Sequence, residues 1–167
     1  MPTESPEALI ERYLHAQIPL SAVMGVRVAH ATAGRVRLTA PLAPNINHNE
    51  TVFGGSAASV ATLAAWTLLH LRLTAEGLSA RVLIQRSRME YQRPIPGDFE
   101  ARCCFEDALA WERFRTLLGR RRRARIRLTA ELIYRDERTS AFEGEFVAIV
   151  SHRDASGTAA RDGAQCT

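Results

Sequence analysis

Polar side chains and glycines gather directly in front of one long apolar segment. The stretch NINHNETVFGGS, residues 45–56, contains Asn47, His48 and the Gly54–Gly55 pair, and an apolar run follows it. The start of a helix leaves about four backbone N–H groups without partners and carries a partial positive charge. These amides therefore either receive a cap from their own loop or hold an electron-rich ligand. His48 adds an imidazole, which suits general-base chemistry near neutral pH.

Three helices are predicted around this loop. Ser5 and Pro6 start an amphipathic helix over 6–17. The run 54–75 is apolar on nearly every side, so we expect a helix that other structure surrounds. A shorter helix is predicted over 108–118, with Gly119 as its C-cap.

Alternating apolar and polar residues predict six strands. They cover residues 23–30, 34–41, 79–93, 98–106, 124–135 and 139–152. The first two form a hairpin, and 98–106 is expected to be the hairpin partner of 79–93 across a Pro-Ile-Pro-Gly-Asp turn.

The order of these elements predicts an α+β fold, because consecutive antiparallel strands leave the helices on one face. We expect a long central helix wrapped by a curved antiparallel sheet of five to six strands. A single domain is predicted over 1–152, since 167 residues are too few for two comfortable ones. The segment 153–167 has almost no apolar residue and is predicted to be a disordered C-terminal tail.

Composition and charge indicate the class of partner and the cellular compartment to expect. The net charge of +4 and the pI near 9.5 fit an anionic partner. Three cysteines without a C-x-x-C spacing favour a reduced, intracellular setting, so a cytoplasmic location is expected. The N-terminus does not have the pattern of a signal peptide, and the helix 54–75 carries too many polar residues for a membrane span.

An ordered set of motifs resembles the hotdog fold of acyl-CoA thioesterases. Asn47 lies six residues before Phe53-Gly54-Gly55, where many members of that superfamily have His-Gly-Gly. EYQRPIPGD resembles the aromatic-x-x-Pro segment of the family. AWERFRTLLGRRRRARIRL is most similar to a bacterial putative-thioesterase branch, whose members occur alone or fused C-terminal to acetyltransferase domains. The resemblance covers residues 6–152.

The resemblance implies hydrolysis of an acyl thioester. The amides of Gly54, Gly55 and Ser56 would hold the developing oxyanion, with Gly55 as the catalytic position. Asn47 would orient water or the carbonyl group, and His48 would be the general base. The other expected substrate contacts are Phe53, Gly54, Ser56, Ser59, Thr62, Ser87 and Tyr91. Glu90 is a further candidate base if a second protomer brings it near the loop.

Two residues depart from the family pattern. Phe53 replaces a histidine, and Thr62 occupies the place of the usual catalytic Asp or Glu; no carboxylate occurs from 54 until Glu76. A non-catalytic acyl-CoA binding module is therefore the alternative function. A hydratase relative would need a histidine–carboxylate pair at the helix start, which the sequence lacks. No metal and no cofactor are expected, apart from the coenzyme A in the substrate itself.

Simpler interpretations remain open for several of these residues. The asparagines of 45–49 could only cap and turn the chain, and His48 could have no role. The hydroxyl residues of the helix and the pair Ser87 and Tyr91 could serve packing alone. The arginines of 120–127 have three interpretations. A solvated face is favoured, a binding site for the phosphates of coenzyme A comes second, and a nucleic-acid surface comes last.

A homodimer or tetramer is expected, because an isolated sheet of this kind exposes an edge and family members usually complete the site between protomers.

Overall fold

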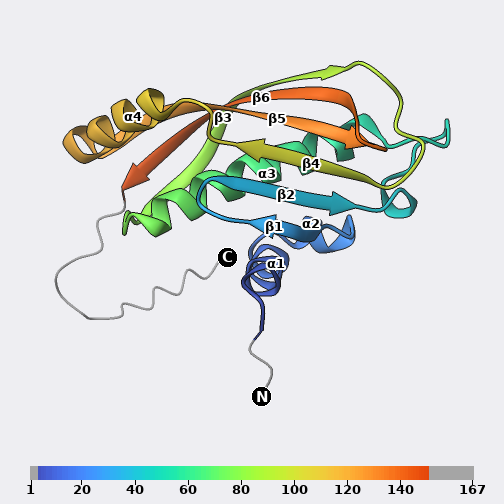
Figure 1. Ribbon diagram of the computed structural model, residues 1–167, viewed down its shortest axis with the longest axis horizontal. Helices are drawn as coiled ribbons and strands as arrows, with labels where there is room; N and C mark the ends of the chain where they lie inside the picture. Colours follow the sequence, from blue (N-terminus) through green and yellow to red (C-terminus); the bar gives the residue numbers. More distant parts are fainter. Residues whose placement is uncertain (1–3, 151–167) are drawn as a thin grey trace, which may run out of the picture.

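The computed structural model describes residues 4–150 and contains a six-stranded antiparallel sheet (Figure 1). The strand order is β1-β2-β4-β5-β6-β3. The strands are β1 (Arg27–Ala31), β2 (Arg35–Ala40), β3 (Ala80–Tyr91), β4 (Phe99–Cys104), β5 (Arg123–Tyr134) and β6 (Glu137–Val150). The helices are α1 (Pro6–Gln17), α2 (Pro19–Val23), α3 (Gly54–Ala75) and α4 (Ala108–Arg121), with a 3-10 turn at Ala43–Asn45. This architecture confirms the predicted α+β fold with a long helix against an antiparallel sheet.

Helix α3 is the centre of the core, and its bounds are those predicted. Its apolar residues are buried on several sides; Val60, Leu68 and Leu69 have no exposed surface. The sheet curves over this helix (Figure 1). After α3 the chain turns at Gly77, whose φ of +70° lies in the left-handed region that suits glycine. Because α3 is buried in the core, its first turn lies at one end of a rigid element.

The sheet has an apolar face toward α3 and a charged outer face. Burial alternates along β2 and along most of β5, as the sequence pattern predicts. Leu38, Ile126 and Phe146 are buried on the helix side. Arg37, Arg125 and other arginines and glutamates lie exposed on the outer face.

The predicted hairpin between 79–93 and 98–106 is wrong. Strand β3 pairs antiparallel with β6, and β4 lies between β2 and β5. The proline-rich segment between Tyr91 and Phe99 is a crossing connection, held where the amide of Val52 donates to the carbonyl oxygen of Ile95 at 2.8 Å. A turn motif between two strands does not require them to be neighbours, and here β3 becomes an edge of the sheet.

Two predicted element ends also differ. Helix α4 continues through Gly119 to Arg121, and its cap is Arg122 at a φ of +55°, whose amide bonds to the carbonyl oxygen of Leu118. The predicted first strand begins only at Arg27, because the short helix α2 occupies Pro19–Val23. No helix among residues 4–150 is long and apolar enough to cross a membrane. The predicted tail 153–167 and residues 151–152 of the predicted last strand lie outside the described residues.

Candidate active site

The first turn of α3 presents backbone amides without partners. Phe53 is the N-cap with extended backbone angles, and its side chain accepts no capping hydrogen bond. The amide of Ala57 donates to the carbonyl oxygen of Phe53, which closes the first turn. Within residues 4–150, the N–H groups of Gly54, Gly55 and Ser56 have no hydrogen-bond acceptor. They therefore remain available to an electron-rich group.

A cleft of about 280 Å³ opens beside this turn. Gly54 and Ala57 line it from α3, Tyr91 lines it from the end of β3, and Ser140 lines it from β6. The hydroxyl group of Tyr91 donates a hydrogen bond of 2.9 Å to the carbonyl oxygen of Gly54. The helix start is thus tied to the sheet at the wall of an open cleft.

Two exposed aromatic rings flank the glycine pair. Phe53 and Tyr91 are each 57% exposed. A Cβ atom at Gly55 would lie 2.3 Å from the Phe53 ring, and one at Gly54 would lie 3.4 Å from the Tyr91 ring. Only glycine lets Phe53 lie this close to the backbone at position 55.

The asparagines of the preceding loop are bonded to their own chain. The Asn47 side chain accepts from the amide of Asn49 at 2.8 Å and donates to the hydroxyl of Thr51 at 3.0 Å. Buried Asn45 donates through its side chain to the carbonyl oxygens of Met24 and Pro41. Both residues therefore fix the loop in front of α3, and the Asn47 amide would have to leave Thr51 to contact a ligand.

The two candidate bases lie in different places. His48 is exposed at the tip of the loop and forms no hydrogen bond with the described residues. Glu90 lies on the outer face of β3, where it pairs with Arg88 at 2.8 Å. Tyr91, the next residue, points to the helix side, so Glu90 is separated from the helix start of its own chain by the sheet.

A second, mostly apolar groove runs along α3. It has a volume of about 300 Å³ and is lined by Ser59, Thr62 and Trp66 of α3, Leu20 of α2 and Ile84 of β3. The Ser59 hydroxyl donates to the carbonyl oxygen of Gly55 at 2.8 Å, so Ser59 contacts the first turn of α3 and also lines this groove.

Other site residues lie at the margins of these two hollows. Ser56 is half-buried in the first turn of α3. Ser87 shares the helix-side face of β3 with Tyr91 but lines neither hollow. Arg93 and Ser140 line the cleft and were not predicted. Ser140 is the register partner of Tyr91, so only the correct β3–β6 pairing could have placed it there.

Titratable groups in the rest of the described chain do not form a metal site. Among residues 4–150 no group of three or more His, Cys, Asp or Glu side chains could hold a metal ion. Cys103 is buried against the core, and burial raises the pKa of its thiol to about 12. This cysteine is therefore a packing residue at neutral pH.

Comparisons with known proteins identify the relatives of this fold. A family model described as "Putative thioesterase (yiiD_Cterm)" matches residues 7–150. A Chlorobaculum tepidum protein of unknown function has a TM-score of 0.79 and 26% identity, over 86% of this chain and 93% of that chain. A putative thioesterase from Shewanella oneidensis has a TM-score of 0.76 and 25% identity, over 86% and 96%. A probable thioesterase from Pseudomonas aeruginosa, at 22% identity and a TM-score of 0.74 over 90% and 99%, shares the fold. The predicted resemblance to hotdog-fold thioesterases is confirmed.

Proposed function

This chain belongs to the putative thioesterase family whose model matches residues 7–150, and from that premise we propose that it hydrolyses acyl-CoA thioesters at the start of α3. The observation that carries the proposal is the set of unpartnered amides at Gly54, Gly55 and Ser56 beside an open cleft. An acyl oxygen placed there would accept hydrogen bonds that strengthen as negative charge develops.

The chemical step needs a polarised carbonyl group and an attacking water molecule. Thioester resonance is weak, so amide donors alone lower the barrier substantially; removing one such donor typically costs about 10²–10³ in rate. The glycines at 54 and 55 allow the thioester to approach the backbone closely. Gly55 is the proposed catalytic amide, and its neighbours Gly54 and Ser56 assist.

Water activation is proposed to come from the loop 45–52. The loop carries two titratable side chains, His48 and Glu50, and we assign the role of base to His48, which is exposed and whose imidazole suits general-base chemistry. Asn47 holds the loop through Asn49 and Thr51, so its contribution is to keep His48 within reach. Thr62 lines the groove along α3, but a hydroxyl group cannot take the place of a carboxylate base.

The acyl chain would lie in the groove beside α3. Ser59 joins the groove to the helix start, and Trp66 and Ile84 give it an apolar wall. Phe53 and Tyr91 would contact the thioester end of the substrate, because their rings flank the glycine pair. Ser87, on the helix-side face of β3, would contact substrate only from the open edge of that strand.

A second copy of the chain would complete this site. Among the described residues 4–150, β3 pairs on one side only, with β6, and its exposed residues include Leu83 and Ile84. A long exposed edge strand is a template for pairing with another strand. Association of two β3 edges would bury Ile84 and enclose the groove, so a homodimer is the proposed working form.

The absence of a carboxylate from α3 favours one other function, a non-catalytic acyl-CoA binding module. Residues 54–75 contain neither Asp nor Glu. In such a module the same amides and groove would hold the ligand without turnover.

Steady-state hydrolysis of a panel of acyl-CoAs, followed by release of the free thiol, distinguishes the two functions. We expect turnover that the His48→Ala variant lowers by at least about tenfold, while His30→Ala, on the sheet away from the loop, hydrolyses at the parent rate. Tight binding of acyl-CoA without thiol release would select the binding module. Turnover that survives Asn47→Ala and His48→Ala together would contradict the assigned residues.

A further inference from the structure

The first half of β5 has no strand beside it on the side of β4. β4 pairs with β5 only from Cys103 opposite Ala130 to Glu100 opposite Ile133. β5 begins much earlier, at Arg123, and over residues 123–129 its described strand neighbour is β6 alone. Backbone groups of alternate residues in this stretch therefore face away from β6 without a strand partner. At its end the carbonyl oxygen of Thr129 accepts from the Cys103 thiol at 3.0 Å, so the open edge is residues 123–128.

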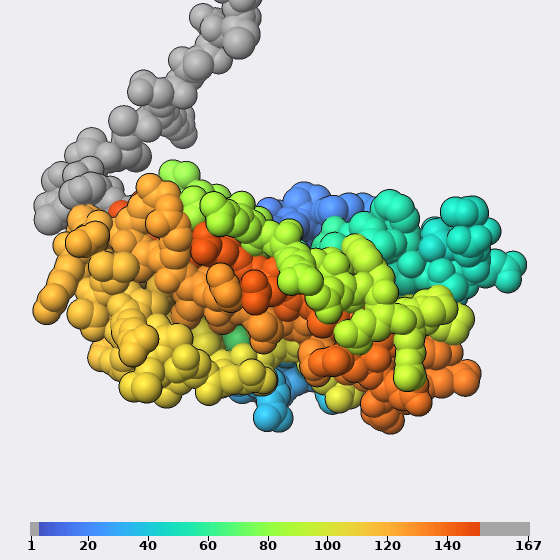
Figure 2. Space-filling model, turned by 90° about the horizontal axis from the view of Figure 1, so that it is seen from above, coloured from blue at the N-terminus to red at the C-terminus, as the bar shows by residue number. Residues whose placement is uncertain are grey.

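Helix α4 stands beside this open edge and leaves a groove. The groove has a volume of about 490 Å³ and is lined by residues 125–129 of β5 and by Ala110, Arg113, Phe114 and Leu117 of α4. Figure 2 shows the surface hollowed between the yellow atoms that precede and form α4 and the orange atoms of β5. One wall is thus a strand edge and the other is a helix, which is the geometry that accepts an extended peptide as an added strand.

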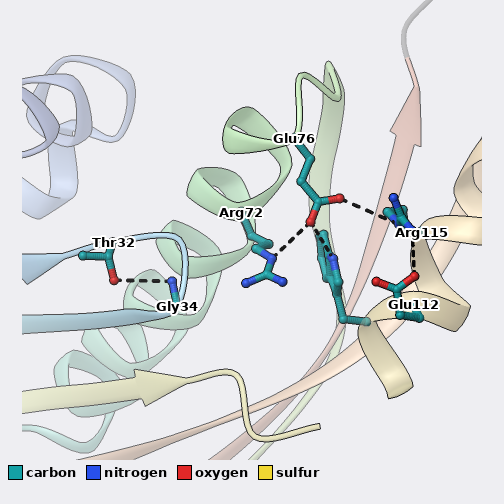
Figure 3. Close-up of polar contacts among 7 residues, drawn as sticks. Thr32, Gly34, Arg72, Glu76, Glu112 and Arg115 are labelled. Carbon is teal, nitrogen blue, oxygen red and sulfur yellow. Dashed lines mark hydrogen bonds and ion pairs between the residues drawn. The ribbon is translucent and has the colours of Figure 1, made fainter. Parts of the chain in front are cut away.

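The groove is preformed because α4 is fixed to the end of α3 (Figure 3). The Glu76 carboxylate accepts from the indole nitrogen of Trp111 at 2.8 Å and from Nε of Arg72 at 3.3 Å. The Arg72 guanidinium lies 5.1 Å from the centre of the Trp111 ring. Arg115 of α4 also pairs with Glu76, at 3.9 Å. A ligand would not have to order this helix in order to bind.

The charges at the groove select an acidic occupant. Arg113 forms no ion pair or hydrogen bond through its guanidinium with the described residues. Arg125 and Arg127 lie on the strand that forms the opposite wall, where Arg125 donates to the side-chain oxygen of Gln85 at 2.6 Å and Arg127 pairs with Glu143 at 3.5 Å. Arg113 is therefore the cation that would meet an acidic residue first, and an acidic residue at Arg125 or Arg127 would share that arginine with its present partner. The carboxylates at the other end are already engaged: Asp107 caps α4 at the amide of Ala110, and Glu106 accepts from Cys104. Leu117, 39% exposed, adds an apolar contact.

We propose that the groove between α4 and the open edge of β5 binds an extended acidic segment of a partner protein by β-strand addition. Backbone hydrogen bonds to residues 123–128 would supply affinity. Side chains of the peptide would alternate between the two faces, so acidic residues would meet Arg113, Arg125 and Arg127 while small apolar residues would meet Leu117. This interaction does not depend on the proposed thioesterase activity.

The test uses the whole chain and a synthetic seven-residue peptide of alternating glutamate and valine, titrated by calorimetry. We expect binding that Arg113→Glu weakens by at least about tenfold, since it replaces a cation by an anion at the wall. Arg120→Glu makes the same charge change on α4 outside the groove and should alter affinity less than about twofold. Ala110→Phe, which fills the groove without changing charge, should also weaken binding.

The backbone of the peptide gives the second arm. Methylation of alternate peptide nitrogens removes the hydrogen bonds of an added strand and should abolish binding, and the amide signals of residues 123–128 should shift only with the unmethylated peptide. Binding that methylation does not affect would overturn the proposal. An equal loss of peptide affinity in Arg113→Glu and Arg120→Glu would also overturn the proposal, and so would binding of a short RNA in place of the peptide. Each of these results would show a surface that binds polyanions in general.

Discussion

The hydroxyl group of Tyr91 donates a 2.9 Å hydrogen bond to the carbonyl oxygen of Gly54. This contact joins the last residue of β3 to the first residue of α3. Residues 37 positions apart in the sequence are thereby held together at the proposed catalytic amides. The position of these amides then depends on the sheet as well as on the loop before the helix.

Replacement of Tyr91 by Phe removes this hydrogen bond and keeps the ring over Gly54. A single neutral hydrogen bond is worth roughly 0.5–1.5 kcal/mol. We therefore expect kcat/KM for acyl-CoA to fall about two- to tenfold. Tyr13→Phe, on α1, removes an exposed hydroxyl remote from the cleft and should not change the kinetics. Equal rates in the Tyr91→Phe variant and the parent would show that this bond does not position the amides.

Replacement of Ile84 by Asp tests the proposed dimer. A carboxylate at the open edge of β3 would be buried without a partner in a β3-to-β3 interface, so it should convert the dimer to a monomer. Light scattering after size-exclusion chromatography measures the mass, and activity should fall with it. Leu109→Asp on α4, where the side chain is 68% exposed, is the matched control and should stay dimeric. A dimeric Ile84→Asp protein would place the interface elsewhere.

Replacement of Glu76 by Ala should destabilise the fold. The variant leaves the indole nitrogen of Trp111 without its acceptor, and Trp111 is only 2% exposed. The free energy of unfolding in urea should fall by about 1–3 kcal/mol. Glu112→Ala removes only an exposed pair with Arg115 and should cost less than about 0.5 kcal/mol. A similar small loss in both variants would contradict the proposed anchoring of α4.

Acidification should destabilise the protein through His70. Its ring lies between Tyr13 and Trp66, with ring centroids 5.2 and 5.0 Å away, and burial lowers its pKa below 6.5. The unfolded chain then binds a proton more readily than the folded chain, so stability is lost as the pH falls below 6.5. His70→Gln should flatten the dependence of the melting temperature on pH in this range. Exposed His48→Gln is the control, and an unchanged slope in His70→Gln would contradict the assignment.

The sequence was sufficient to predict the main elements of the fold. Helix α3 was predicted from Gly54 to Ala75 because its composition is apolar on nearly every side. The alternation along β5 correctly separated Ile126 and Leu128 from Arg125 and Arg127. These patterns are local, so they can be read within a window of one helix or one strand.

The partners of the strands were not predictable in the same way. The position of β3 at the sheet edge, next to β6, depends on contacts between residues far apart in the sequence, such as Ala80 opposite Val150 and Tyr91 opposite Ser140. The amides at Gly54 and Gly55 belong to one local motif, so the sequence indicates them. Arg93 and Ser140 reach the cleft through the pairing of β3 with β6, so the sequence does not indicate them. The bonds from Asn47 to Thr51 and Asn49 show a loop-fixing role that the residue type left open.

The most direct test of the proposed function compares kcat/KM for acyl-CoA hydrolysis in Gly54→Pro and Gly54→Ala. Proline removes one amide donor at the first helical position, where the extended Phe53 tolerates it, and alanine keeps that donor while adding a Cβ atom at the same place. Both proteins should fold. We predict that Gly54→Pro loses about 10²–10³ in rate relative to Gly54→Ala. Equal rates in the two folded variants would contradict the claim that the Gly54 amide, at the start of α3, helps to hold the thioester oxygen.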